Sequence, residues 1–211
     1  MKPFVFRASS LATIMTEPKA KSELLSVGAK TECERLAKQL VYGYTEEVSS
    51  KYMEKGIQVE PDSLALYNSV FFTNYTKNTE RRSNEWITGE CDIFTGSKII
   101  DLKSSWSLPT FPATAAAGKD TTYEWQCRAY MWLWECQESE VAYCMVDTPQ
   151  ELIGWEREEL HYVSQIPEVL RVTRVFYTRD TEMEERIKFK VDAANAYLQS
   201  IVQQIAAEHA G

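Results

Sequence analysis

The stretch Gly89-Glu90-Cys91-Asp92-Ile93-Phe94-Thr95-Gly96-Ser97-Lys98-Ile99-Ile100-Asp101-Leu102-Lys103-Ser104 decides the fold of this chain. Two apolar runs flank a Thr-Gly-Ser cluster, a pattern that predicts a β-hairpin with its turn at residues 95–97. Asp92 is expected on the first strand of the hairpin and Asp101 on the second. Because the two strands are neighbours, these two acids can meet around one ion.

Alternation along the second strand separates its charged residues from its apolar ones. Side chains two residues apart point to the same face, so Asp101 and Lys103 project side by side, roughly 6.6 Å apart along the strand. Ile100 and Leu102 point to the opposite face, into apolar packing. Two acids and a lysine on paired strands suit a divalent metal ion and an attacking water.

Length and composition favour one domain in a reducing compartment. The 211 residues are 44% hydrophobic, enough for one substantial core, so residues 1–211 are expected to form a single domain. No apolar run reaches the roughly 18 residues of a membrane span, and the first residues are too few and too polar for a signal peptide. The five cysteines form no CxxC pair, which indicates free thiols in the cytoplasm.

The formal net charge of −8 argues against a general nucleic-acid binder, because phosphate binding relies on lysine and arginine. It does not exclude an enzyme that acts on DNA, since such an enzyme can gather its positive charge in one channel and keep an acidic metal site. The candidates for a DNA path, each of which could equally be a solvated surface charge, are Lys77, Arg81, Arg82, Lys119 and Arg128.

A helical pattern that begins near Lys55 carries a carboxylate on its apolar face. A carboxylate on a buried face is costly unless it is paired or binds a metal, which makes Glu60 a candidate site residue. Alternatively, Glu60 lies at a helix start and is solvated there, because Pro61 prefers the first turn of a helix. The apolar residues expected on the face of Glu60 are Ile57, Leu64, Tyr67 and Phe71.

The other elements follow from periodicity. A helix over residues 121–137 carries Tyr123, Gln126 and Tyr130 on one polar face. A long last helix opens with a capping-box pattern at residues 181–184, and its apolar stripe is expected to pack on the sheet or, alternatively, to form a subunit contact. Strands are expected at residues 71–75, 86–94, 98–104, 141–147 and 172–177, and helical segments at 31–44 and 156–170. This order predicts an α/β domain with a central mixed β-sheet flanked by helices.

Phosphodiester hydrolysis needs a stronger nucleophile than water and relief of charge in the transition state, and a bound Mg²⁺ supplies both. Mg²⁺ takes oxygen ligands, usually one or two carboxylates with waters. Asp92 and Asp101 can provide the carboxylates, the Leu102 carbonyl a further oxygen, and Glu60 a ligand for the ion or its water. Lys103 is positioned to orient the water or to stabilise negative charge.

Three blocks of the sequence resemble the PD-(D/E)xK nuclease superfamily and, within it, phage alkaline exonucleases of the lambda-exonuclease type. Residues 55–60 are similar to the Gly-x-x-x-Glu helix of that family, and residues 89–93 with 99–104 match its metal-binding hairpin. Residues 123–131 are similar to its Tyr-x-x-Gln-x-x-x-Tyr-Met helix. Phe6-Arg7-Ala8-Ser9-Ser10 is weakly similar to a segment that holds the 5′-phosphate, and no motif is recognised after residue 145.

The resemblance implies a Mg²⁺- or Mn²⁺-dependent exonuclease, with two ions in the active complex, that digests duplex DNA 5′→3′ and leaves 3′ overhangs for recombination. It also implies a homotrimeric ring threaded by DNA ends, a single-strand annealing partner, and a host cytoplasmic location if the gene is a phage gene. The implied metal ligands are Asp92, Asp101, Leu102 and Glu60, with Lys103 as the catalytic lysine, Gln126 and Tyr123 in support, and Arg7, Ser9, Ser10, Arg81 and Arg82 toward DNA or its 5′-phosphate.

Two departures from the family pattern concern the metal geometry. Asp101 stands where Glu is commoner, and Cys91 replaces the usual Pro before the first acid. Glu90 is an additional carboxylate, equally suited to a second metal ion or to a salt bridge. The alternatives to an exonuclease are a structure-selective endonuclease of the same superfamily and a non-catalytic DNA-binding or assembly module. The module is disfavoured because Glu60, Asp92, Asp101 and Lys103 are all present.

Overall fold

The computed structural model describes residues 2–46 and 49–209, and its centre is a four-stranded mixed sheet in the order β4-β5-β6-β7. β5 and β6 run parallel, whereas β4 and β7 are antiparallel to their neighbours at the two edges. The predicted α/β class with a mixed sheet is therefore confirmed. The strands are β4 (Ile93–Phe94), β5 (Lys98–Ser104), β6 (Glu138–Cys144) and β7 (Val172–Thr178).

A second sheet of three short strands lies beside the first, in the order β1-β3-β2. Its strands are β1 (Phe6–Arg7), β2 (Arg82–Ser83) and β3 (Ile87–Gly89). β1 pairs in parallel with β3, and Arg7 lies opposite Thr88. This pairing brings the N-terminal segment next to the strand that leads into the hairpin.

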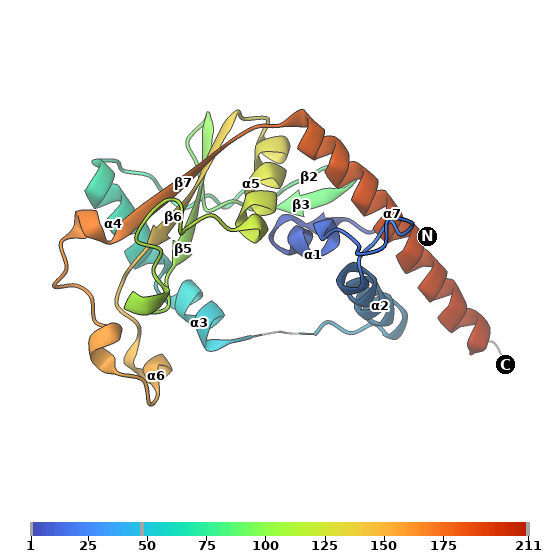
Figure 1. The fold of residues 1–211 in the computed structure, drawn as a ribbon, viewed down its shortest axis with the longest axis horizontal. Coiled ribbons are helices and arrows are strands. Elements are labelled where there is room, and N and C mark those ends of the chain that lie inside the picture. Colours follow the sequence, from blue (N-terminus) through green and yellow to red (C-terminus); the bar gives the residue numbers. More distant parts are fainter. Residues whose placement is uncertain (1, 47–48, 210–211) are drawn as a thin grey trace.

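Two helices cover opposite faces of the larger sheet, α4 (Glu60–Phe71) and α5 (Thr121–Trp134) (Figure 1). The alternation of β5 assigns its side chains to these faces. Ile100 and Leu102 are buried in a cluster with Tyr67 of α4, as the sequence predicts. Asp101 and Lys103 therefore point to the face that α5 covers.

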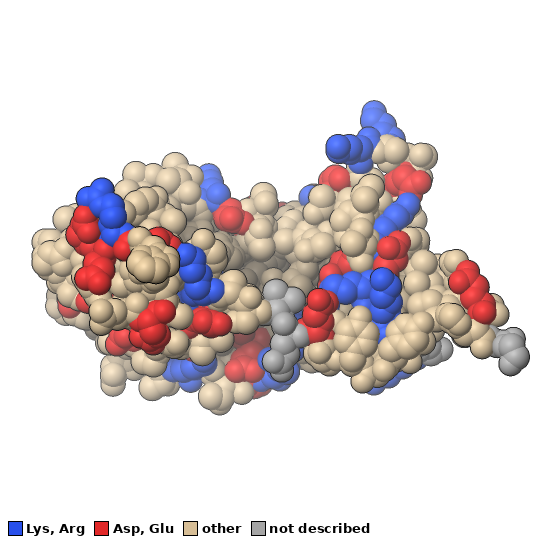
Figure 2. All heavy atoms as spheres, turned by 90° about the horizontal axis from the view of Figure 1, so that it is seen from below, with Lys and Arg blue, Asp and Glu red and all other residues tan. Residues whose placement is uncertain are grey.

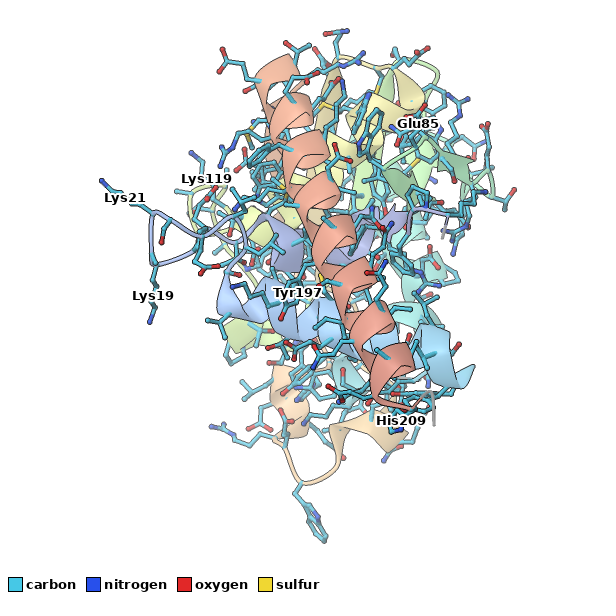
Figure 3. All side chains as sticks on the ribbon, turned by 90° about the vertical axis from the view of Figure 1, so that its right-hand side faces the viewer. Lys19, Lys21, Glu85, Lys119, Tyr197 and His209 are labelled. Atoms are coloured by element: carbon cyan, nitrogen blue, oxygen red, sulfur yellow. The ribbon has the colours of Figure 1, made fainter. Side chains whose placement is uncertain are left out.

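The long C-terminal helix α7 (Thr181–Glu208) packs mainly on α2 (Val27–Tyr42), and not on the sheet as predicted (Figures 1 and 3). Small side chains on α2 let the two helices approach closely, and the Tyr197 hydroxyl of α7 donates to Glu34 of α2 over 2.8 Å. The shared core contains Ala29, Cys33, Ala37, Ile187, Val191, Ala194 and Leu198. Asp180, one residue before the predicted capping box, accepts from the first backbone N–H groups of α7.

The strand predicted at residues 71–75 does not form, because α4 continues to Phe71 and Phe72 ends it in the left-handed region at φ 53°. The Asn68 side chain then accepts from the Thr73 hydroxyl and the Tyr75 N–H, which fixes the chain after α4 as a loop. The helical pattern near Lys55 is two helices, α3 (Lys51–Gln58) and α4, so Ile57 is 73% exposed and not on a shared apolar face.

Residues 156–170 also differ from the expected helical segments. They contain two short 3₁₀ turns, Glu158–Leu160 and Glu168–Leu170, after the one-turn helix α6 (Gln150–Ile153). Asp147 holds this segment by accepting from the N–H groups of Val163 and Ser164. Because side-chain bonds fix this segment, helical periodicity in its sequence is a poor guide to its structure.

Candidate active site

The hairpin forms as predicted, but the strand expected at residues 86–94 is interrupted between β3, which ends at Gly89, and β4, which begins at Ile93. The Thr95 N–H donates to the Lys98 carbonyl over 3.0 Å, and Gly96 in the turn has a φ of +91°, which glycine adopts without strain. Asp92 lies just before β4 instead of on it. Its Oδ2 accepts from the Leu102 backbone N–H over 2.7 Å. Because the N–H and C=O of one strand residue point to the same side, the Leu102 carbonyl faces Asp92 as well.

Asp101 is 1% exposed and is held from two sides. Lys103 Nζ lies 2.6 Å from Asp101 Oδ2, and Gln126 Nε2 of α5 donates to Asp101 Oδ1 over 3.1 Å. The other hydrogen of Gln126 Nε2 goes to the Tyr130 hydroxyl at 2.9 Å. The polar face of α5, on which the spacing predicts Gln126 and Tyr130 together, therefore fixes the orientation of this carboxylate.

Tyr130 in turn packs against a glycine for which no other residue fits. A Cβ on Gly89 would lie 2.6 Å from the Tyr130 ring, well inside contact distance. The first residue of the hairpin segment is thus a glycine because α5 packs closely on β3. Replacing it would move the ring that supports Gln126.

Lys103 remains a cation within this acidic group. Burial alone would lower the pKa of Lys103, but the carboxylates of Asp101 and Asp92 outweigh it and raise that pKa above its usual value. The ammonium also lies 4.9 Å from the centre of the Tyr123 ring. In its protonated form Lys103 can donate to a water or a phosphate oxygen.

The pKa of Asp92 is raised, which favours the neutral form of this carboxyl group. Burial and the nearby charge of Asp101 raise its pKa to about 7, although Lys103 and the Leu102 N–H act against this. The protein without a bound cation thus accommodates a second negative charge poorly. A divalent cation would remove that penalty.

This shift predicts a pH-dependent stability. The folded state binds the Asp92 proton more tightly than the unfolded state, so the stabilisation is complete below about pH 4 and is lost as the pH rises toward 7. Urea unfolding in EDTA should therefore show wild type falling behind Asp92→Asn as the pH rises from 4 to 7, by up to about 4 kcal/mol. A difference between the two proteins that stays constant over this pH range would contradict the assignment.

Glu60 lines the same cavity as Asp92 and is paired there with Lys77. Lys77 Nζ lies 2.5 Å from Glu60 Oε2, and Glu60 occupies the first position of α4, followed by Pro61. The helix-start reading of Glu60 is therefore the one that describes its place in the fold. The hydrogen bond from Lys77 to Glu60 raises the pKa of Lys77, with Asp92 and Glu90 contributing.

Glu60, Lys77 and Asp92 line one cavity of about 240 Å³. Its wall is formed by Glu60, Pro61, Leu64, Lys77, Asp92, Ile93 and Leu102. Asp101 Oδ2 is buried and accepts no well-directed hydrogen bond from any residue within the described ranges. Across residues 2–46 and 49–209, no three His, Cys, Asp or Glu side chains form a ready metal cluster. Two aspartates and a backbone carbonyl nevertheless match what Mg²⁺ takes from a protein, the rest being water.

Of the residues predicted near DNA, three arginines are paired with glutamates, and the others are exposed. Arg81 pairs with Glu90 over 3.1 Å, so the additional carboxylate is a salt-bridge partner here. Arg82 pairs with Glu80 and lies over the rings of Phe94 and Trp134. Arg128 is 14% exposed and bonds Glu124 and the Thr178 carbonyl, which places it in the packing of α5 on β7. Arg7, Ser9 and Ser10 are exposed, and Lys119 is exposed after the loop that follows β5.

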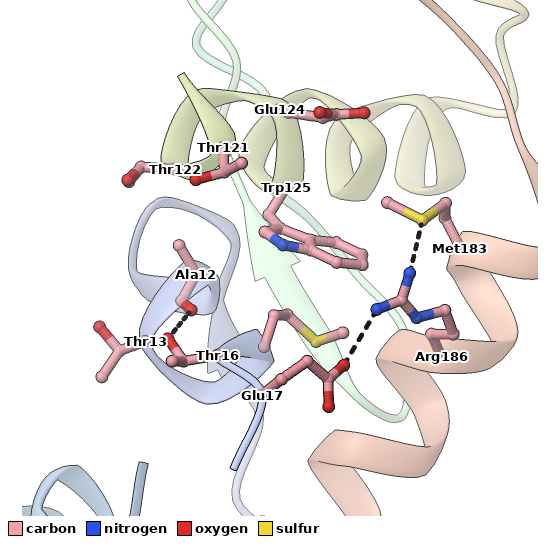
Figure 4. Close-up of a pocket in the computed structure, with 11 residues that line it drawn as sticks. Ala12, Thr13, Thr16, Glu17, Thr121, Thr122, Glu124, Trp125, Met183 and Arg186 are labelled. Atoms are coloured by element: carbon pink, nitrogen blue, oxygen red, sulfur yellow. Dashed lines mark hydrogen bonds and ion pairs between the residues drawn. The ribbon is translucent and has the colours of Figure 1, made fainter. Parts of the chain in front are cut away.

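A second cavity, of about 570 Å³, has neither Asp92 nor Asp101 in its lining (Figure 4). It is bounded by α1 (Leu11–Met15), the first turns of α5 and the start of α7. Arg186 crosses it, bonded to Glu17 over 3.0 Å and lying over the Trp125 ring. The arginine in this cavity, Arg186, is thus already paired with Glu17 of the same chain.

Lys55 is a buried charge that the sequence reasoning missed. The side chain is 1% exposed, and Nζ donates to the carbonyls of Ser105, Trp106 and Val146 at 2.6, 3.0 and 3.0 Å. Burial lowers the pKa of Lys55 to about 8. Lys55 stands one residue before Gly56 in the motif helix, and nothing in the sequence there indicates that the lysine is buried.

The surface carries charges of both signs. On the face shown in Figure 2, basic and acidic side chains are interspersed, and in Figure 3 Lys19 and Lys21 extend into solvent from the loop after α1. Among the helices of the described residues, none has both the length and the apolar character to cross a bilayer.

The chain is similar to solved exonuclease structures. A phage-related exonuclease from Haemophilus somnus 129PT aligns with a TM-score of 0.89 and 33% identity, over 96% of this chain and 97% of that chain. An alkaline exonuclease from Laribacter hongkongensis, LHK-Exo, aligns with a TM-score of 0.71 and 19% identity, over 98% and 93%. Its complex with dAMP gives 0.71 and 20%. No family model and no curated protein matches the sequence.

Proposed function

The chain belongs to the phage-related exonucleases of the lambda-exonuclease type, and from this we propose that it is a divalent-metal-dependent exonuclease that digests one strand of linear duplex DNA 5′→3′. The observation that supports the proposal most strongly is the group formed by Asp92, Asp101 and Lys103. The Asp101 carboxylate is buried beside Lys103, and the half-buried Asp92 lines the cavity of about 240 Å³. Nothing in the packing of the core requires these three charges together.

Each residue has a separate task in this proposal. Asp92, Asp101 and the Leu102 carbonyl would hold Mg²⁺ or Mn²⁺, which supplies an activated water and screens the phosphate when bound. Gln126 keeps the Asp101 carboxylate in one orientation. Lys103 donates toward the scissile phosphate or the attacking water and stabilises the negative charge that develops there.

The assembly and partners are also proposals. We infer duplex DNA ends as substrate, a product with a 3′ overhang, two ions in the active complex, a homotrimeric ring, and a single-strand annealing protein as partner. These rest on the resemblance of residues 55–60, 89–104 and 123–131 to the family motifs. Analytical ultracentrifugation would test the ring, since a purified monomer at micromolar concentration would contradict it.

The proposed exonuclease is tested with linear duplexes, with and without 5′-phosphate, beside a covalently closed circle. In Mg²⁺ or Mn²⁺ we expect progressive loss of the linear DNA and an intact circle, and in EDTA no digestion. Cleavage of the circle would favour the structure-selective endonuclease instead. Absence of cleavage with either ion would favour a binding module that kept the fold.

A further inference from the structure

Lys77 and Glu60 form an ion pair on the wall of the active-site cavity, 2.5 Å between Nζ and Oε2. Asp92 and Leu102 line the same cavity, so the ammonium stands in a space bounded by proposed metal ligands. The Lys77 side chain is 49% exposed and that of Glu60 is 25% exposed. The lysine can therefore reach the carboxylate and can also leave it for solvent.

The backbone, more than the long side chain, determines where Lys77 lies. The N–H of the next residue, Asn78, donates to the Asp92 carbonyl over 2.7 Å, and Asn78 Nδ2 donates to the Cys91 carbonyl over 3.0 Å. The loop after α4 is thus fastened to the segment that carries Asp92. The backbone at Lys77 is therefore held beside the segment that carries Asp92.

On these contacts we propose that Lys77 is a positioning residue that occupies Glu60 in the metal-free protein and must release it before Glu60 can serve a divalent ion. The inference rests on the proposed function, because it presumes that the cavity takes such an ion. Lys77 and the cation compete for the same carboxylate. Lys77 therefore raises the concentration of divalent ion at which the site fills.

The test measures Mn²⁺ binding to DNA-free protein by isothermal titration calorimetry. Lys77→Met removes the competing charge and should tighten binding roughly tenfold. Lys77→Arg keeps the pair and should bind as wild type does. Lys30→Met is the matched control, because Lys30 pairs with Glu23 at the same 2.5 Å, on α2, outside the residues that line the cavity.

A double variant identifies the carboxylate involved. In a Glu60→Gln background, Lys77→Met should give no further gain, since the carboxylate for which the two cations compete is gone. Mn²⁺ affinity of Lys77→Met that equals or falls below wild type overturns the role of Lys77 while leaving the proposed function intact. Wild type that binds no Mn²⁺ at millimolar concentration would overturn both.

Discussion

Replacing Lys103 with methionine should lower the rate of DNA hydrolysis by about 10² to 10³-fold and leave the fold unchanged. Methionine keeps most of the volume of the side chain but removes the ammonium that lies 2.6 Å from Asp101. Removal of one preorganised donor from a transition-state site costs on this order. The measurement is single-turnover digestion of a linear duplex in saturating Mg²⁺ at pH 8, with circular dichroism to confirm the fold.

Lys98→Met is the matched control for this variant. Lys98 is on the same strand, but its side chain points to the other face, where it pairs with Glu140. We expect a protein that loses some stability and cleaves at close to the wild-type rate. If Lys103→Met cleaved within threefold of wild type, or if both variants lost activity equally, the proposed role of Lys103 would be wrong.

The second large effect is expected on stability, from Lys55→Met. Lys55 ties the end of β5 and the end of β6 to α3 through three carbonyl groups, and methionine fills the space without donating. Buried acceptors that lose their donor cost about 1 kcal/mol or more each, so we expect a loss of about 3 kcal/mol or more in the free energy of unfolding. Urea denaturation at pH 7 measures this directly.

Lys51→Met separates the effect of burial from that of losing a lysine on α3. Lys51 is 41% exposed and pairs with Glu156 in solvent, so its replacement should cost less than about 1 kcal/mol. Ser105, the first residue whose carbonyl Lys55 contacts, lies three positions after Leu102. Loss of this contact should therefore also reduce cleavage, because β5 would be less well aligned. Equal stability of the two variants would contradict the account.

Much of the site could be predicted because it is local in sequence. The hairpin follows from alternation and a Thr-Gly-Ser turn, and alternation also places Asp101 and Lys103 on one face. The hydrogen bond from Gln126 to Asp101 agrees with the polar stripe of its helix. In these places one short-range period decides which way each side chain points.

The structure differs from the sequence-based predictions where contacts between distant residues decide it. Phe71 to Tyr75 has the composition of a strand, but the hydrogen bonds that the Thr73 hydroxyl and the Tyr75 N–H donate to Asn68 Oδ1 make it a loop. α7 has a stripe that would suit a sheet, yet small residues on α2 offer a closer fit. The pairing of Glu60 with Lys77 joins residues 17 positions apart, which no periodicity reports.

The most direct test of the central claim is strand-resolved digestion of a linear duplex by the purified protein. One preparation carries a label at a 5′ end and the other at the 3′ end of the same strand, and both duplex ends are open to the enzyme. In Mg²⁺ the account predicts immediate release of the 5′ label and late release of the 3′ label, with neither released in EDTA. Early release of the 3′ label, or release of either label in EDTA, would contradict it.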